Sequence, residues 1–97
     1  MSDDEINAAI AESLGWSLVG TSIRAGRPPG ADYVGSEFIP NYCNDLNAMH
    51  EAENAILDTD LFYHYSLHIS GPLLRANARQ RAEAFLRTLG KWEEAQP

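Results

Sequence analysis

The sequence has one cysteine, no long apolar run and few basic residues. With Cys43 as its single thiol, the chain cannot form an intrachain disulfide or a cysteine-based zinc site, and it suits a reducing compartment. No stretch of 18 successive apolar residues is present, which argues against a membrane-spanning helix. The chain does not open with a charged segment followed by an apolar one, as a secretory signal would. We therefore expect a cytoplasmic protein.

Basic residues are half as numerous as acidic ones, 7 against 14, and the formal net charge is −7. Such a chain is poorly suited to neutralising phosphates, so direct binding of nucleic acid is not expected. The charge is also uneven. Between residues 32 and 60 every charged side chain is acidic, whereas residues 75–91 carry five basic side chains and one acidic one, Glu83. This distribution predicts ion pairs between the last helix and the rest of the chain, or a basic partner.

The 97 residues predict a single domain that contains three helices. The first helix spans residues 2–14, because Ser2 and Glu5 form a capping-box pattern and Gly15 follows the apolar stripe. The central helix spans residues 42–57, after the break that Pro40 imposes. The last helix spans residues 77–89, with Asn77 as its cap and Gln80 three residues later.

Strands are harder to place. Residues 15–41 read as irregular with short strands, and 24–30 within them as a loop rich in glycine and proline. Residues 61–69 alternate in a way typical of a strand. Residues 93–97 are expected to form a frayed tail. Together these segments predict an α+β fold, a small layered domain with three helices packed on a small antiparallel sheet in the order α-β-α-β-α.

One carboxylate interrupts the apolar side of the predicted central helix. Glu53 falls on the apolar side, between Met49 and Leu57, when residues are spaced at about 100°. Such a group must be paired, protonated or at the rim of the packed surface. The pattern favours the rim position, with the carboxylate in water, over a buried pair.

Three segments carry a resemblance to a known family. They are residues 39–53 (IPNYCNDLNAMHEAE), 6–16 (INAAIAESLGW) and 81–92 (RAEAFLRTLGKW). Together they resemble the phage ABA sandwich family, a group of small, largely uncharacterised bacteriophage and prophage proteins. The resemblance implies layered packing of helices and sheet and a role in a host bacterial cell. It supplies no catalytic signature.

The lineage and the missing catalytic motifs predict a non-enzymatic accessory protein without a cofactor. It would bind a host protein, for example one of an antiviral defence system. The proposed contact surface is the polar side of the central helix, which we call the acidic face: Asn47, Glu51, Asn54 and Asp58. The alanine-rich side of the same helix would also allow a homo-oligomer.

A second interpretation is a small-molecule binder that sequesters a nucleotide signal. Arginines would hold the phosphates and tyrosines would stack on the base. The candidate residues are Arg24, Arg27, Tyr33, Tyr63, Tyr65, Arg75 and Arg79. The loop around Arg24 is not a P-loop, because the Lys-Ser/Thr ending and the helix after it are absent.

A third interpretation is a metal-dependent hydrolase that uses His64, His68 and nearby acids such as Glu53, Asp58 or Asp60. On a strand, the two histidines would lie about 13 Å apart, too far to share one ion, so no metal site is predicted. His50 lacks the second histidine of a zinc-protease helix. Cys43 lies near a helix start, which can activate a thiol, but a structural role is favoured.

Overall fold

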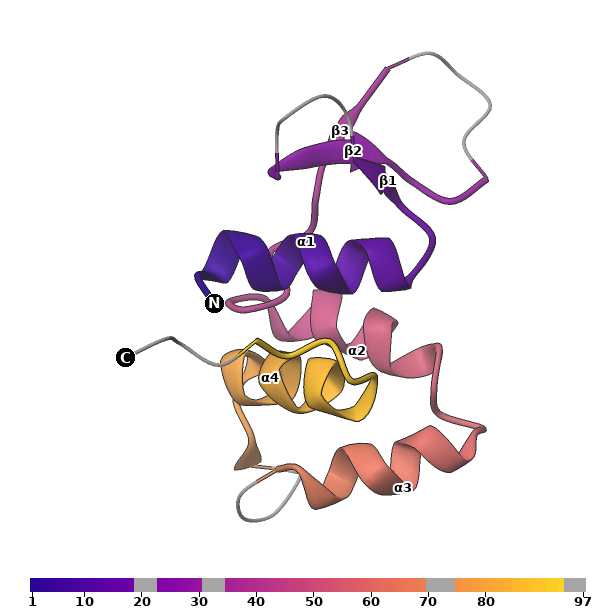
Figure 1. Ribbon diagram of the computed structural model, residues 1–97, viewed down its shortest axis with the longest axis vertical. Coiled ribbons are helices and arrows are strands. Elements are labelled where there is room, and N and C mark those ends of the chain that lie inside the picture. The colour runs from indigo at the N-terminus through magenta and orange to yellow at the C-terminus, as the bar shows by residue number, and fades with distance from the viewer. Residues whose placement is uncertain (19–22, 31–34, 70–74, 94–97) are drawn as a thin grey trace.

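A computed structural model describes residues 1–18, 23–30, 35–69 and 75–93 of the chain. Within these residues lie four helices and a three-stranded sheet (Figure 1). The helices are α1 (Asp3–Ser13), α2 (Leu46–Asn54), α3 (Asp60–Leu67) and α4 (Ala78–Thr88), and the strands are β1 (Ser17–Leu18), β2 (Ala25–Arg27) and β3 (Glu37–Phe38). The α+β class is confirmed. The predicted order and number of helices are wrong, since the described order is α-β-β-β-α-α-α.

The first and last helices form where their caps predict. The side chain of Ser2 accepts the N–H of Glu5 at 3.2 Å, and Glu5 accepts the N–H of Ser2 at 2.9 Å. Asn77 and Gln80 repeat this reciprocal pair at the start of α4. Both capping boxes satisfy donors that a helix start leaves unpaired. Gly15, just after α1, has a φ of +100°, which a residue with a side chain rarely adopts.

The central helix is shorter than the predicted range of 42–57. Residues 41–44 form a turn in which the N–H of Asp45 bonds to the carbonyl of Asn41 at 2.8 Å. The extended backbone of Asp45 then separates this turn from α2, and its carboxylate caps the N–H groups of Asn47 and Ala48. The cap at Asp45 thus sets the start of α2 at Leu46, and the helix ends at Asn54, where a turn follows.

The segment predicted as a strand at residues 61–69 is helix α3. Thr59 caps it by accepting the N–H of Leu61 at 3.2 Å. Tyr65 and Ile69 are buried and Phe62 is half-buried, so the residues that face the core are spaced by three and four positions. That spacing belongs to a helix. The alternation of the sequence was misleading because three residues on the apolar side of the expected strand, Leu61, Tyr63 and Leu67, are exposed in the structure.

The sheet lies entirely within residues 15–41, the segment predicted to be irregular with short strands, so the strands expected there are confirmed. Its order is β1-β2-β3 with antiparallel neighbours, and Gly26 of β2 pairs with Leu18 on one side and Glu37 on the other. The predicted loop at 24–30 therefore contains the central strand. Gly26 allows this, because a Cβ at that position would lie 2.8 Å from the carbonyl oxygen of Ser17.

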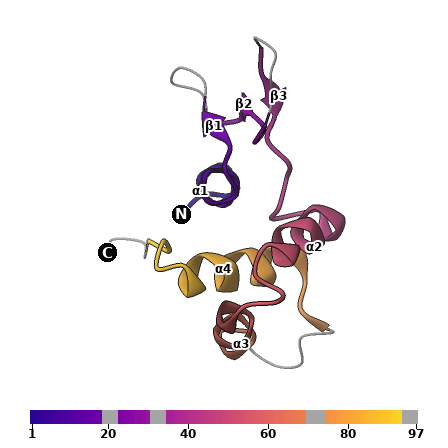
Figure 2. The same ribbon diagram turned by 90° about the vertical axis from the view of Figure 1, so that its right-hand side faces the viewer.

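Helix α4 lies at the centre of the molecule and contacts α1, α2 and α3 (Figures 1 and 2). The sheet stands apart from these contacts, on the side of α1 that faces away from α4. The largest fully buried side chains all belong to helices: Ile6, Ile10, Met49, Tyr65, Phe85 and Leu86. The core therefore forms between helices rather than between helices and a sheet. Of the predicted tail, residues 94–97 lie outside the described residues.

Candidate functional site

The acidic face lies on the solvent side of α2 and of the turn that follows it. Asn47, Glu51 and Asn54 follow one another at helical spacing and are exposed, as is Asp58 in the turn. Two leucines of the same stretch are also accessible: Leu57 is 51% exposed and Leu61 is 37% exposed. Carboxylates and amides thus lie along the chain beside apolar side chains that packing leaves uncovered. This combination suits contact with another protein.

Most other acidic side chains have intramolecular partners. The Nε atom of Arg24 lies 2.9 Å from a carboxylate oxygen of Asp4, and that of Arg79 lies 3.2 Å from Asp3. Across the described ranges, neither Glu51 nor Asp58 forms an ion pair. The two carboxylates of the acidic face therefore keep their negative charge, whereas those of Asp3, Asp4, Glu53 and Glu83 are paired with arginines.

Glu53 is buried, so the predicted rim position is wrong. Its carboxylate accepts hydrogen bonds from Arg81 Nη1 at 2.8 and 3.1 Å and from the hydroxyl of Tyr65 at 2.9 Å. His50 Nδ1 lies 3.1 Å from the same group. Burial, and then the neighbouring Glu53 carboxylate, raises the pKa of Tyr65 well above its usual range. Glu53, Tyr65 and Arg81 form a buried network that joins three helices, with the exposed His50 at its edge, so Glu53 is unavailable to a ligand.

The residues proposed to hold a nucleotide do not gather at one place. Tyr65 is fully buried and Tyr63, two residues before it on α3, is 66% exposed. Arg24 and Arg79 are engaged with Asp4 and Asp3 in the ion pairs described above. Arg27 donates to the carbonyl of Gly35 at 3.3 Å, Arg75 is exposed before α4 begins, and Tyr33 lies outside the described residues.

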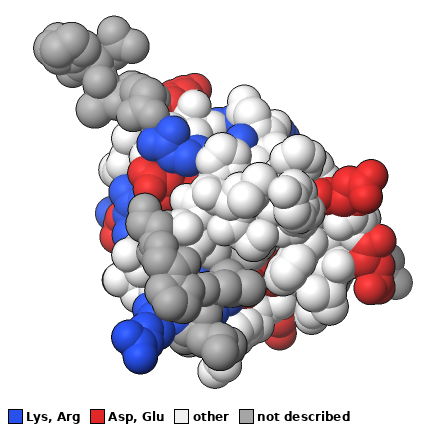
Figure 3. Space-filling view, turned by 90° about the horizontal axis from the view of Figure 1, so that it is seen from below, with Lys and Arg blue, Asp and Glu red and all other residues white. Residues whose placement is uncertain are grey.

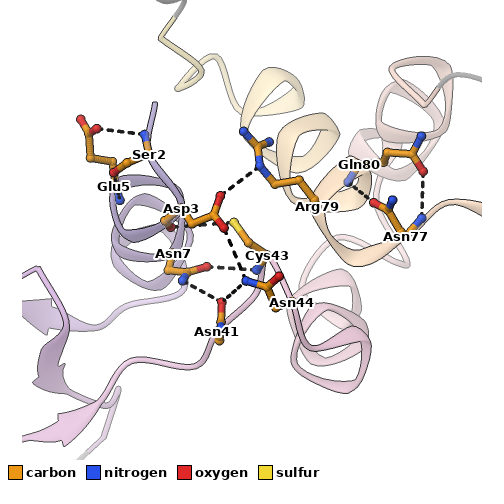
Figure 4. Close-up of polar contacts among 10 residues, drawn as sticks. All are labelled: Ser2, Asp3, Glu5, Asn7, Asn41, Cys43, Asn44, Asn77, Arg79 and Gln80. Atoms are coloured by element: carbon orange, nitrogen blue, oxygen red, sulfur yellow. Dashed lines mark hydrogen bonds and ion pairs between the residues drawn. The ribbon is translucent and has the colours of Figure 1, made fainter.

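A polar cluster joins α1, the turn at 41–44 and α4 (Figure 4). Asn7, which is buried, accepts the N–H of Cys43 at 3.1 Å and donates to Asn41 at 3.1 Å. Asn44 donates to Asn41 and to Asp3, and Arg79 reaches Asp3 from α4. The cluster holds the turn before α2 against the first turn of α1. Sequence reasoning missed it, because the hydrogen bonds that join its elements connect residues 34 or more positions apart.

Cys43 lies at the inner edge of this cluster and is buried. Burial, with a smaller contribution from Asp3, raises the pKa of its thiol to about 11. A thiolate is the reactive form of cysteine, so this environment favours the structural role over the reactive one.

An open cleft of about 420 Å³ adjoins the same cluster. Its polar lining is Asp3, Asp4, Asn7, Arg24, Asn41 and Asn44, and its apolar lining is Ile23, Phe38 and Ile39. Phe38 is 87% exposed, so the apolar wall is accessible. Two carboxylates against one guanidinium make the cleft more suitable for a neutral or cationic group than for a phosphate.

The candidate metal ligands do not form a complete site within the described residues. Over the described ranges, no group of three or more His, Cys, Asp and Glu side chains could hold a metal ion. Glu53 is engaged in the buried network, whereas Asp58 and Asp60 are exposed near the start of α3. His64 and His68, which the sequence placed on a strand, lie on and at the end of helix α3.

Comparison with protein families, curated proteins and solved structures found no match for this chain. The resemblance to the phage ABA sandwich family therefore remains a prediction from the three sequence segments. None of the helices in the described residues is long and apolar enough to span a bilayer.

Proposed function

We propose that this chain is a non-enzymatic binding protein that occupies a basic surface of a host protein through its acidic face. The observation that carries the proposal is the exposure of Asn47, Glu51, Asn54 and Asp58 together on one stretch, with Glu51 and Asp58 in none of the ion pairs of the described residues. Such charges cost little to leave in water. They attract a partner of opposite sign and help to orient it during association.

Affinity also needs apolar area that binding removes from water, and Leu57 and Leu61 supply it next to the charges. Viewed from the α3 end, an uncharged area lies between acidic groups at the right-hand edge and a mixture of basic and acidic groups towards the left (Figure 3). An apolar patch with a charged border is the usual composition of a protein interface. The resemblance to phage proteins adds the expectation that the partner is a host protein in the bacterial cytoplasm, such as a component of antiviral defence.

The experiment is affinity capture from a lysate of a bacterial host, with three forms of the tagged chain. The first is the wild type and the second carries Glu51→Lys and Asp58→Lys. The third carries Glu12→Lys and Glu93→Lys, which change the net charge equally at exposed positions away from the acidic face. We expect one host protein to be retained by the wild type and by the third form, and at least tenfold less of it by the second.

Equal retention by all three forms would contradict the proposal. Equal loss from both variants would mean that overall charge, rather than the acidic face, governs binding. Adding salt provides an independent check, because contacts between exposed charges are screened over about 8 Å at physiological ionic strength. Retention by the wild type should therefore fall as salt is raised.

A second candidate is sequestration of a nucleotide signal, and the position of Arg24 in the open cleft beside Phe38 favours it. Asp3 and Asp4 in the same lining oppose it. Small molecules released from the heated, purified protein would decide between the two candidates. If a nucleotide is released by the wild type but not by an Arg24→Ala, Arg27→Ala variant, sequestration is the function.

A further inference from the structure

Because helix α3 takes the place of the expected strand, His64 and His68 are closer together than the sequence predicted. Four residues in a helix rise about 6 Å, against about 13 Å on a strand. His68 follows the last residue of α3 and keeps a helical backbone, with φ −82° and ψ −7°. Side chains four residues apart in a helix lie on the same side, one turn apart. His64 and His68 are therefore neighbours on one side of α3.

Both histidines are exposed. The ring of His64 packs edge-on against that of Tyr63, with 5.7 Å between ring centres. Asp60, one turn before His64, places a carboxylate on the same side of the helix. At the other end, His68 lines a shallow cavity of about 230 Å³ with Arg87, Gly90 and Trp92. Arg87 opposes a bound cation there, and Asp60 favours one.

Two histidines at this helical spacing are the arrangement with which metalloprotease helices hold zinc. Imidazole nitrogen is a good ligand for divalent zinc, nickel and copper ions. Zinc in a closed site takes four ligands in a tetrahedron. Two imidazoles provide half of that set, and no group of three ligating side chains is found within the described residues. The pair on one chain is thus an incomplete site.

A second copy of the chain would complete it. The outer side of α3 carries Tyr63 and Leu67, which are 66% and 63% exposed, and residues 61–68 carry no acid, lysine or arginine. The view from the α3 end shows an uncharged area on this side of the molecule (Figure 3). Two such surfaces can meet across a two-fold axis, which brings the same residues of both chains together. We propose that His64 and His68 of two copies bind one zinc ion and so make a metal-dependent dimer through α3.

The test measures mass and stoichiometry together. Protein treated with EDTA and then exchanged into chelator-free buffer is titrated with zinc chloride and followed by size-exclusion chromatography with light scattering. We expect the monomer mass of 10.7 kDa without metal. Twice that mass is expected once zinc reaches half an equivalent per chain, and EDTA should restore the monomer.

Variants separate the ligands from the contact surface. His64→Gln and His68→Gln should each weaken zinc binding at least tenfold and leave a monomer. His50→Gln, which removes the chain's remaining histidine on α2, should dimerise as the wild type does. Leu67→Glu should oppose the dimer while leaving both imidazoles in place. The replaced side chains on α3 are exposed, so the far-ultraviolet circular dichroism of these variants should be unchanged.

Two results would overturn the proposal. One is a wild-type chain that stays monomeric with zinc, whether it binds a whole equivalent or none. The other is a zinc-dependent dimer that persists in the His64→Gln, His68→Gln double variant, because the ligands would then lie elsewhere.

Discussion

At the scale of single residues, the feature that decides most about this molecule is the carboxylate of Glu53. Taking a charge out of water is costly, and the cost is offset only when its hydrogen bonds are replaced and an opposite charge is close. Arg81 provides the charge, and its Nε donates to the carbonyl of Ala76 at 3.1 Å. Tyr65 supplies a further donor. The network therefore fixes the relative positions of α2, α3 and α4.

Arg81→Ala should be among the most destabilising single substitutions in the chain. It leaves Glu53 buried without its cation, and breaking a buried pair in this way costs about 3–5 kcal/mol. Urea unfolding followed by circular dichroism measures the loss. Glu83→Ala is the control, because its ion pair with Arg87 is half-exposed and should be worth about 0.3–0.5 kcal/mol. A cost below about 1 kcal/mol for Arg81→Ala is the value of an exposed ion pair and would contradict this expectation.

The sequence marks Glu53 as anomalous without revealing its partners. A carboxylate on an apolar helix side is a local signal, and it is visible in the spacing of Met49, Glu53 and Leu57. Arg81 is 28 residues away and Tyr65 is 12 residues away. No local pattern connects positions at such separations, since their proximity depends on how three helices pack. For the same reason the cluster around Asn7 and Asn41 was not predicted.

At the scale of elements, the sequence predicted the caps of the first and last helices correctly, but it did not predict that residues 61–67 are helical. A capping box is complete within four residues, so Ser2 with Glu5 and Asn77 with Gln80 placed two helix starts correctly. Residues 61–69 contain apolar or aromatic side chains on every side, and such a segment fits a helical or a strand period equally well. The cap at Thr59 and the burial of Tyr65 in the core stabilise the helix.

Substitutions at His64 test the helix directly, because that side chain is exposed and packing there contributes little. In a helix, alanine is favoured over valine by about 0.5 kcal/mol. We therefore expect His64→Ala to melt roughly 2–4 °C above His64→Val, for a domain of this size. Thermal unfolding is measured with EDTA present, so that metal plays no part. The opposite order would indicate a strand, in which β-branched residues are favoured.

At the scale of the whole molecule, the described residues form two parts, a helical core and a small sheet beside it. The side chains of the described core come from residues 6–11 and 42–86, and residues 15–41 contribute only partly buried ones such as Trp16 and Ile39. The sheet strands are two or three residues long, too short to show any period in the sequence. This is why the helices at both ends were predictable and the sheet topology was not.

This division predicts that damage to the sheet and damage to the core have different consequences. Gly26→Ala places a Cβ where only 2.8 Å separates it from the carbonyl oxygen of Ser17, so β1 and β2 must move apart. Leu86→Ala empties space in the fully buried core and should cost about 2–5 kcal/mol. Both changes are made in a Trp92→Phe background, which leaves Trp16, next to β1, as the single tryptophan.

We expect Gly26→Ala to alter the fluorescence of Trp16 while the urea midpoint of the helical signal changes little. Leu86→Ala should lower that midpoint strongly, because α4 contacts all three of the other described helices. If Gly26→Ala lowers the helical midpoint as much as Leu86→Ala does, the sheet supports the helical core instead of standing beside it. The exposed Phe38 and the open cleft would then belong to the same cooperative unit as the acidic face.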